Sequence, residues 1–457
     1  MAPVWHDRGM SDDSLVLVRA KVTQVLGEYD HELHLAADDD FVIIYGPNGV
    51  GKTRFLEVIH SLSRLEGRKL ARLPFQEAYL EYSDSTILQV ESTPQKDPEG
   101  DSPLRKRQLT FTLRRPGAAP QVWPYAGDDF EDWLIDTTPW RPLDDDEIWE
   151  DRRDGELAHL SELEQRYPEG GRRRATKLPT PFSEFRGSIA SYLIETQRLR
   201  IEQSRPNRGV HWRPPRGRGQ ELSKISQQAG KMRSLVNDAQ TEHSTITQQL
   251  DRTFPNRILS ESTADRDAEA VRQRYEEQNE FRSRLGRVAS VALADALSLP
   301  DRTLQHWELR LLNLYLDDAD DKLAPFEKLL HKIELLEDIV NSRLLNKRLQ
   351  VTARDGLTVL HEPDGRPIDL ESLSSGEQHE IILMFDLLFN VPQGALVLID
   401  EPEISLHVVW QLAFIPDVQR IAALAGFRFV VATHSPQIIN DEWKRSIRLG
   451  PNEVAFS

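Results

Sequence analysis

The segment Gly46-Pro47-Asn48-Gly49-Val50-Gly51-Lys52-Thr53 decides the fold, because it matches the pattern G-x-x-x-x-G-K-[ST] between an apolar strand and an amphipathic segment. The strand is expected at 41–45, and apolar residues at helical spacing follow from Phe55 to Leu62. In such a loop, backbone N–H groups converge on phosphates, Lys52 adds a positive charge and Thr53 a hydroxyl for Mg²⁺. A glycine-rich turn that binds nothing would not need this order of strand, loop and helix. We therefore predict a phosphate-binding loop (P-loop) at Gly46 to Thr53.

Length and composition limit the class of protein. At 457 residues the chain is long enough for two or three domains, or for one large domain with insertions. Its net charge of −17 repels polyanions overall, so any contact with nucleic acid would need a local basic patch. The absence of cysteine excludes disulfides, thiolate metal sites and cysteine nucleophiles. With neither a leader pattern nor an apolar span in view, we expect a soluble, cytoplasmic protein that makes no membrane contact.

Short β-like runs surround the P-loop strand, and turns containing proline or glycine separate them. These runs lie at 15–25, 32–35, 78–82, 86–91 and 108–114. We predict an antiparallel β layer beside a parallel core sheet.

An acidic segment from Gly127 to Glu169 follows, with Trp133, Trp140 and Trp149 spread through it. One interpretation is a solvated surface insertion, because blocks of like charge usually lie in water. The other interpretation is a docking surface for a partner, with the tryptophans as anchors.

Arginine-rich segments lie at 172–177 and 205–218. The second is rich in proline and glycine, and we expect a mobile loop there. Its arginines and Trp212 could hold phosphates and stack a base. A flexible linker with solvated arginines explains the same residues equally well.

A helical arm is predicted where the periodicity changes. Apolar residues recur three and four apart from Leu222 to Leu250, as in a heptad seam. We expect Pro255 to end this helix and a weaker pattern at 271–288 to return antiparallel, which would make a hairpin. A further helical stretch at 326–344 leads back toward the core.

Two features of this region could be mistaken for metal sites. His243 lies on the heptad seam without a second ligand three or four residues away, so a packed histidine is the better interpretation. The pairs Asp317-Asp318 and Asp320-Asp321 are better explained as a solvated loop than as a metal cluster.

A second apolar strand, Leu396 to Ile399, ends in Asp400 and Glu401. This is the Walker B arrangement that a P-loop needs as its partner. Asp400 at the strand end can hold the Mg²⁺ shell, and Glu401 can polarise the attacking water as a general base. An acidic pair that caps an unrelated strand is the alternative.

Three further motifs complete the set. Ser374 and Glu377 in Leu373-Ser374-Ser375-Gly376-Glu377-Gln378 form a capping box, which predicts a helix with free N–H groups at its start. An apolar strand at 429–432 leads to Thr433-His434-Ser435, where His434 is placed to sense a γ-phosphate. A strand-like run from Ser191 closes on Gln197.

The order P-loop, Gln197, Leu-Ser-Ser-Gly-Glu, Asp-Glu-Pro-Glu and Thr-His-Ser resembles that of ABC-type ATPases and spans almost the whole chain. The resemblance implies an α/β P-loop ABC-type ATPase head with an inserted helical hairpin or coiled-coil arm. It also implies ATP and Mg²⁺ as cofactors, and two heads that dimerise so that the signature of one completes the P-loop site of the other. Ser375 and Glu377 depart from the commonest signature, and the segment after Glu403 departs from that of transporter subunits.

Carried over by position, this resemblance implies a role for each site residue. Residues Gly46, Pro47, Asn48, Gly49, Val50, Gly51, Lys52 and Thr53, with Ser374, Ser375, Gly376 and Glu377, would bind the nucleotide. Thr53, Gln197 and Asp400 would hold the metal, and Glu401, His434 and Gln197 would be catalytic.

The wording Ser-Gly-Glu-Gln-His-Glu, Ile-Asp-Glu-Pro-Glu-Ile-Ser-Leu-His and Ala-Thr-His-Ser-Pro-Gln-Ile-Ile resembles stand-alone prokaryotic ATPases of antiphage defence, such as those of Septu, retron-associated Septu and PARIS systems. The OLD nucleases are cousins of these ATPases. The resemblance implies a homodimer or higher oligomer that holds or releases a separate nuclease, of HNH or TOPRIM type, in response to a nucleic-acid or phage-protein trigger. The sequence ends at Ser457, soon after His434, so we expect the nuclease on another polypeptide.

The alternative function is an SMC-like ATPase head that binds or repairs DNA. For either function we expect an N-terminal ATPase lobe at 1–200 with an acidic insertion at about 115–180. The basic loop and helical insertion would occupy 201–345, and a C-terminal ATPase lobe 346–457.

Overall fold

The computed structural model describes residues 15–36, 39–94, 107–125, 129–142, 148–153, 156–168, 178–194, 223–260, 267–289 and 298–451. The chain forms two compact units, each built from separated segments. Unit 1 comprises Met1–Thr196, Pro392–Glu403 and Gly426–Ser457, and unit 2 comprises Gln197–Val391 and Ile404–Ala425.

Unit 1 contains a five-stranded sheet in the order β11-β15-β16-β3-β17, in which all neighbouring strands are parallel. Its strands are β11 (Ser191–Ile194), β15 (Leu396–Asp400), β16 (Arg428–Thr433), β3 (Phe41–Tyr45) and β17 (Ser446–Arg448). Asp400 pairs with Ala432, and Thr433 pairs with Tyr45. The polar residues that follow these strands therefore meet at one edge, as expected for parallel strands.

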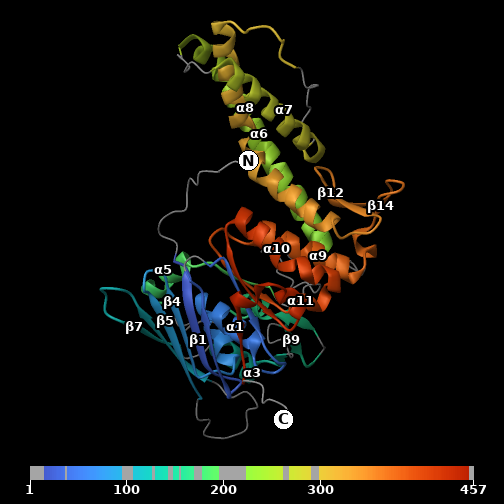
Figure 1. Cartoon of the computed structure of the whole chain (residues 1–457). Coiled ribbons are helices and arrows are strands. Elements are labelled where there is room, and N and C mark those ends of the chain that lie inside the picture. Colours follow the sequence, from blue (N-terminus) through green and yellow to red (C-terminus); the bar gives the residue numbers. More distant parts are fainter. Residues whose placement is uncertain are drawn as a thin grey trace. The chain divides into compact units, whose positions relative to one another are not determined.

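A six-stranded antiparallel sheet is the second layer of unit 1, in the order β2-β1-β4-β5-β6-β7 (Figure 1). Its strands are β1 (Leu17–Val25), β2 (Tyr29–His34), β4 (Glu77–Tyr82), β5 (Ile87–Pro94), β6 (Arg107–Arg114) and β7 (Gln121–Tyr125). The predicted α/β class, with a parallel core and an antiparallel layer, is confirmed. Strand β7 was not predicted.

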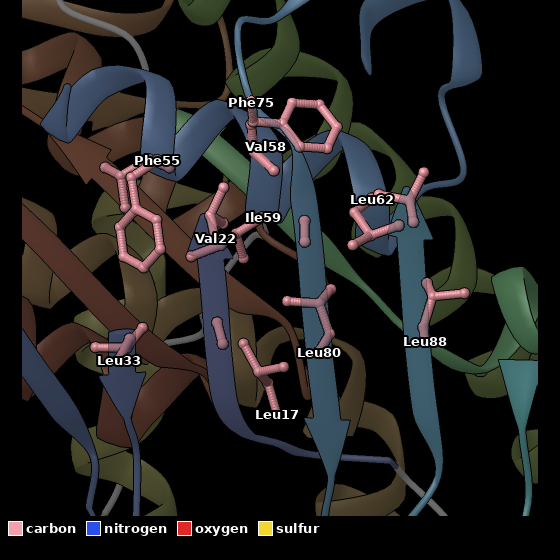
Figure 2. Packing of buried hydrophobic residues seen from close by; sticks show 14 of the residues in the cluster. Leu17, Val22, Leu33, Phe55, Val58, Ile59, Leu62, Phe75, Leu80 and Leu88 are labelled. Carbon is pink, nitrogen blue, oxygen red and sulfur yellow. The ribbon is translucent and has the colours of Figure 1, made fainter. Parts of the chain in front are cut away.

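Helix α1 (Lys52–Ser63) follows the P-loop and buries its apolar face in the core of unit 1. Figure 2 shows Phe55, Val58, Ile59 and Leu62 of this helix beside apolar side chains of β1, β2, β4 and β5. All four helix residues are buried. This packing fixes the start of the helix, and with it the end of the P-loop. Further short helices of unit 1 are α2 (Gly67–Arg72), α5 (Thr180–Ser188) and α11 (Pro436–Ile439).

The acidic segment folds as a small module with its own hydrophobic core. Its elements are α3 (Asp129–Thr137), β8 (Trp140–Pro142), β9 (Ile148–Asp151), β10 (Leu157–His159) and α4 (Leu160–Arg166). Trp140 and Trp149 are fully buried in this core, and Trp133 packs against it. The interpretation as docking anchors is wrong for Trp140 and Trp149, because both rings are buried in the core of the module. The insertion has regular structure of its own, since strands β8, β9 and β10 form a sheet.

Three helices form the arm of unit 2, α6 (Lys224–Ser260), α7 (Ala268–Val288) and α8 (His306–Asn341) (Figure 1). Both α6 and α7 pack against α8. The first half of the predicted seam is buried, through Ile225, Ala229, Met232, Val236 and Ala239. Arg274 and Arg287 of α7 pair with Asp320 and Glu337 of α8 in the same order along both helices, so α7 runs parallel to α8. Helix α6 runs antiparallel to α8, since His243 contacts Phe326 and Arg257 pairs with Asp318. The predicted antiparallel return of the second helix is therefore confirmed, and α8 packs against both helices as a third.

Helix α6 continues through Pro255 to Ser260, so the prediction that Pro255 ends it is wrong. Proline removes one N–H from the helical ladder, but the helix around it remains anchored to α8. Arg257, beyond the proline, forms an ion pair with Asp318 of α8. The prediction that His243 is a packed residue is confirmed. Its ring lies against Phe326, and its Nδ1 lies 2.5 Å from the carbonyl oxygen of Lys322.

The aspartates of α8 lie on a helix, and their prediction as a loop is wrong. Asp317 and Asp320 pair with Arg274 of α7, and Asp318 is buried against α6. Within the described ranges no group of three or more acidic, histidine or cysteine residues is arranged to hold a metal ion.

The arm joins the rest of unit 2 through a buried charge cluster. Arg343, just after α8, has a side chain that is only 5% exposed, and it pairs with Glu380 of α9 (Ser375–Phe385) and Asp417 of α10 (Val408–Ala425). A small antiparallel sheet of β12 (Lys347–Thr352), β13 (Gly356–His361) and β14 (Pro367–Ile368) follows. In the part of the chain that the structure describes, no helix is long and apolar enough to cross a membrane.

Candidate nucleotide site

The P-loop of unit 1 adopts a conformation that requires glycine. Gly49 and Gly51 have φ of +85° and +87°, in the left-handed region that residues with a Cβ avoid. A Cβ on Gly51 would also lie 2.6 Å from Cγ1 of Val25. At Gly46 a Cβ would lie 2.4 Å from the carbonyl oxygen of Leu449. Val25 and Leu449 therefore pack closely against the loop, and a side chain at Gly46 or Gly51 would disturb its conformation.

Lys52, the first residue of α1, turns its ammonium group back over the loop. Its Nζ donates to the carbonyl oxygens of Gly46 and Pro47, each at 3.1 Å. Burial lowers the pKa of Lys52, and the negative charges of Glu401 and Asp400 partly offset this effect. A buried cation held at the mouth of a glycine loop fits the phosphates of a nucleotide.

Thr53 and Asp400 meet although they are 347 residues apart in sequence. The Thr53 hydroxyl lies 3.2 and 3.0 Å from the two carboxylate oxygens of Asp400. A hydroxyl and a carboxylate are oxygen ligands of the kind that Mg²⁺ accepts, usually with water and phosphate oxygens. These two residues fit an Mg²⁺ that accompanies a bound nucleotide.

Glu401 and His434 lie beside this pair. Glu401 has φ of +42°, a conformation that costs energy for a residue with a Cβ. Its backbone N–H donates to the carbonyl oxygen of Ala432 at 2.8 Å. Its carboxylate oxygen lies 3.1 Å from Nε2 of His434, and that nitrogen lies 2.6 Å from Nζ of Lys52. The strained backbone thus aims the Glu401 carboxylate at the same place as the lysine and the histidine.

Glu403 accepts hydrogen bonds from the segment that carries His434, a role that the sequence did not indicate. Its Oε1 accepts from the Thr433 hydroxyl at 2.8 Å and from the His434 N–H at 2.5 Å. The only sequence signal was its place in Asp-Glu-Pro-Glu, two residues after the expected base. A carboxylate that accepts two hydrogen bonds here fixes the backbone of the histidine.

The signature segment lies in unit 2, at the start of α9. Ser374 caps this helix and Glu377 completes the predicted capping box, so the box itself is confirmed. Lys347 donates to both oxygens of Glu377 at 2.8 Å. Burial raises the pKa of Glu377, but the bonds from Lys347 and Ser374 outweigh this and lower its pKa overall. The Glu377 carboxylate thus organises the helix start, while Ser374 and Ser375 are exposed.

Three predicted functional segments lie outside the described residues. Gln197 follows the end of β11 but falls in the range 195–222, as does the arginine-rich loop at 205–218. The basic run at 172–177 is outside them as well. The remaining predicted residues divide between the units, with the P-loop, Asp400, Glu401 and His434 in unit 1 and the signature in unit 2.

Comparison with solved structures finds heads of SMC proteins. An Smc head domain with an extended coiled coil from Pyrococcus furiosus, bound to the C-terminal domain of ScpA, is 13% identical with a TM-score of 0.33, over 93% of this chain and 91% of that one. The SMC head domain from Thermotoga maritima is 10% identical with a TM-score of 0.30, over 96% of this chain and 99% of that one. No curated protein matches the chain.

A family model matches residues 173–440, which is more than half of the chain. The match includes the signature, the Walker B strand and His434, and it begins after the P-loop. The chain belongs to the family described as "AAA domain, putative AbiEii toxin, Type IV TA system".

Proposed function

We propose that the chain binds and hydrolyses ATP with Mg²⁺ in an ABC-type site, as one subunit of a larger complex. The observation that carries this proposal is the meeting of Lys52, Thr53, Asp400, Glu401 and His434 at the carboxyl edge of the parallel sheet. Membership in an AAA-domain family agrees with it. Bound ATP·Mg²⁺ supplies the phosphoanhydride to be cleaved and the cation that offsets its charge.

Each residue has a role in this proposal. The P-loop N–H groups and Lys52 bind the phosphates, and Thr53 and Asp400 hold the metal. Glu401 would accept a proton from the attacking water, and the ring of His434 would donate a hydrogen bond to the γ-phosphate. Gln197, as the family resemblance implies, would contact the metal and the water.

We further propose that two copies pair head to head, so that Ser374, Ser375 and Gly376 of one copy complete the P-loop site of the other. The exposed start of α9 supports this, because the capping box uses the N–H groups of Ser374 and Glu377 but not those of Ser375 and Gly376. Glu377 would act through the helix start that it organises. The three segments 1–200, 201–345 and 346–457 would then be two ATPase lobes that flank the arm.

A mixing experiment tests the shared site. Lys52→Ala lacks the phosphate cation, and Gly376→Asp puts a negative charge at the signature, so neither homodimer should hydrolyse ATP. A symmetric exchange of subunits places one intact composite site in each mixed dimer, which should restore about a quarter of the wild-type sites. The control is Lys52→Ala mixed with Lys52→Ala, Gly376→Asp, which has no intact site. Activity of the Gly376→Asp protein alone would exclude a role for the signature.

For the biological role we propose an antiphage defence complex in the cytoplasm, in which ATP state and a phage-derived trigger hold or release a separate nuclease. The support is the motif wording together with the "AbiEii toxin" and "Type IV TA system" in the family description. Cells that carry the locus should plate phage less efficiently, and Glu401→Gln should remove this protection. The neighbouring gene product should copurify with the chain, and protection that does not need Glu401 would contradict ATP-dependent sensing.

The long helices of the arm favour a second candidate, an SMC-like head that binds or repairs DNA. Helix α6 has 37 residues and α8 has 36, so each is roughly 55 Å long. Titration of the purified chain with duplex DNA at increasing salt separates the two functions. Tight binding that falls steeply with salt would favour the second candidate, because phosphate contacts release counterions.

A further inference from the structure

His31 of β2 contacts the P-loop from within the core of unit 1. Its side chain is buried, with only 2% of the residue exposed, and its Nε2 lies 2.7 Å from the carbonyl oxygen of Val50. A carbonyl oxygen can only accept a hydrogen bond. Nε2 of His31 therefore carries a proton and donates it to Val50.

Aromatic neighbours fix the orientation of this imidazole. The ring of Tyr29 stacks on it at 6.0 Å with an angle of 5° between the planes, and Phe55 of α1 meets it edge-on at 5.5 Å. Burial lowers the pKa of His31, which favours a neutral ring. The donor thus points at Val50 from a rigid site.

The position of the Val50 carbonyl determines that of the next N–H group. Val50 and Gly51 share a planar trans peptide, in which C=O and N–H point to opposite sides. Because His31 holds the carbonyl, the N–H of Gly51 points away from β2. Gly51 directly precedes α1, where N–H groups and the helix dipole favour an anion.

A second contact holds the same peptide. Val50 is buried, with 3% of the residue exposed, and its side chain packs against Gly450, where an added Cβ would lie only 2.7 Å from Val50 Cγ1. With its carbonyl bonded on one side and its side chain wedged on the other, the Val50 peptide has little freedom to rotate.

We propose that His31 is a positioning residue of the P-loop, which holds the Val50–Gly51 peptide so that the Gly51 N–H faces the phosphate chain of the nucleotide. This inference rests on the proposed nucleotide site and names a residue that acts on it through the loop. His31 does not touch the nucleotide itself.

The sequence offers a direct probe of this peptide, because Val50–Gly51 is the one place where valine precedes glycine. Labelling valine carbonyls with ¹³C and glycine nitrogens with ¹⁵N leaves a single amide peak in a carbonyl-filtered spectrum of the full chain. In the wild-type protein, inorganic pyrophosphate or ATP should shift this peak. His31→Phe keeps a planar aromatic ring and removes the donor, so it should move the peak without ligand and reduce the shift on adding pyrophosphate.

Binding and kinetics supply the second readout. We expect His31→Phe to weaken pyrophosphate and ATP binding roughly 10- to 100-fold, the range for loss of an oriented donor to a charged group. The KM for ATP should rise while kcat changes less, because the N–H binds substrate and transition state alike. His31→Gln replaces Nε2 with an amide donor and should stay within a few-fold of wild type. His34→Phe, on the same strand with a 64% exposed side chain, is the matched control.

The outcomes separate this inference from the proposed function. If neither pyrophosphate nor ATP shifts the Gly51 amide peak of the wild-type protein, the proposed nucleotide site is contradicted. A responsive wild-type peak that is identical in His31→Phe contradicts the role of His31. If His31→Gln and His31→Phe lose affinity equally, the hydrogen bond to Val50 is not what positions the loop, and the inference is overturned.

Discussion

Nζ of Lys52 lies 2.6 Å from Nε2 of His434, so the expected P-loop cation and the expected phosphate sensor are in direct contact. The same Nε2 lies 3.1 Å from Glu401. One ring nitrogen can accept from Lys52 or donate to Glu401, but it cannot do both. Binding of phosphate to Lys52 would therefore release Nε2 of His434 to donate.

This contact predicts that the effects of changing Lys52 and His434 are not additive. Lys52→Ala should weaken ATP binding roughly 10- to 100-fold, because a charged hydrogen bond to phosphate is lost. His434→Ala should mainly lower kcat. A double-mutant cycle on kcat/KM, with residues in contact, should give a coupling of about 0.5–3 kcal/mol. Fully additive losses would indicate that the two side chains act separately.

Glu401→Gln should separate binding from hydrolysis. The amide keeps the size of the carboxylate and cannot accept the proton from water, so kcat should fall about 10²- to 10⁴-fold. The Kd for ATP should change by less than about threefold, since no phosphate contact of Glu401 is removed. Steady-state phosphate release and equilibrium titration with a fluorescent ATP analogue measure the two quantities. Glu28→Gln, an exposed residue of unit 1, serves as the control.

Removal of Mg²⁺ should abolish the stabilisation that ATP gives. A ligand at one hundred times its Kd stabilises a protein by about 2.7 kcal/mol, which EDTA should reverse if the metal bridges ATP and protein. Thr53→Ala and Asp400→Asn should each raise the Mg²⁺ concentration needed for half of the Tm shift by roughly tenfold. Asp441→Asn, an exposed carboxylate in the same unit, should leave the titration unchanged. Equal Tm shifts with and without EDTA would argue against a metal between Thr53 and Asp400.

The stability of unit 1 should fall as pH is lowered from about 6.5 to about 4. Burial lowers the pKa of His60 in α1 from 6.5 to about 4, where Nδ1 lies 3.0 Å from the Ser191 hydroxyl. Between these values the unfolded chain binds a proton that the folded chain does not, so acid favours unfolding and pH above 6.5 adds nothing. At about 1.4 kcal/mol per pKa unit, the loss approaches roughly 3 kcal/mol at pH 4.

Hydrogen exchange of α1 amides at several pH values measures this slope. His60→Gln cannot titrate in this range and should flatten it, whereas His34→Gln, with an exposed histidine on β2, should not. An unchanged slope in His60→Gln would assign the acid sensitivity to other groups.

The buried cluster in unit 2 predicts a large loss of stability from one substitution. Arg343→Met leaves Glu380 buried without its cation and leaves Asp417 with only the half-exposed Arg420 at 3.6 Å, which should cost about 3–5 kcal/mol in urea unfolding. Adding Glu380→Gln and Asp417→Asn removes the unpaired charges and should recover much of this loss. Arg354→Met, with a side chain that is 91% exposed, should change little. A triple variant no more stable than the single one would point to packing, and not charge, as the source.

The sequence predicted the parts of the fold that depend on local pattern. Strand, glycine loop and helix are contiguous at Gly46 to Thr53, and the carboxyl ends of parallel strands necessarily meet, so the approach of Asp400 and His434 to the P-loop was foreseeable. The capping box at Ser374 is local as well.

Contacts without a local signature could not be predicted. His31 lies on an ordinary antiparallel strand, and nothing in the alternation of β2 indicates that its ring reaches Val50. Pro255 misled the prediction because tertiary contacts of Arg257 outweigh one lost hydrogen bond in the helix. Trp140 and Trp149 misled it because acidic neighbours suggested exposure, while the rings themselves form a core.

That separate core around Trp140 and Trp149 has a consequence for how such chains evolve. A segment whose apolar residues pack among themselves can be deleted, duplicated or exchanged as one block without rebuilding the sheets beside it. Related genes should therefore differ by the presence or identity of this block between β7 and α5. The sequence distances between motifs that lie on the same side of the block should stay the same. We expect this segment to vary between related proteins independently of the residues of the nucleotide site.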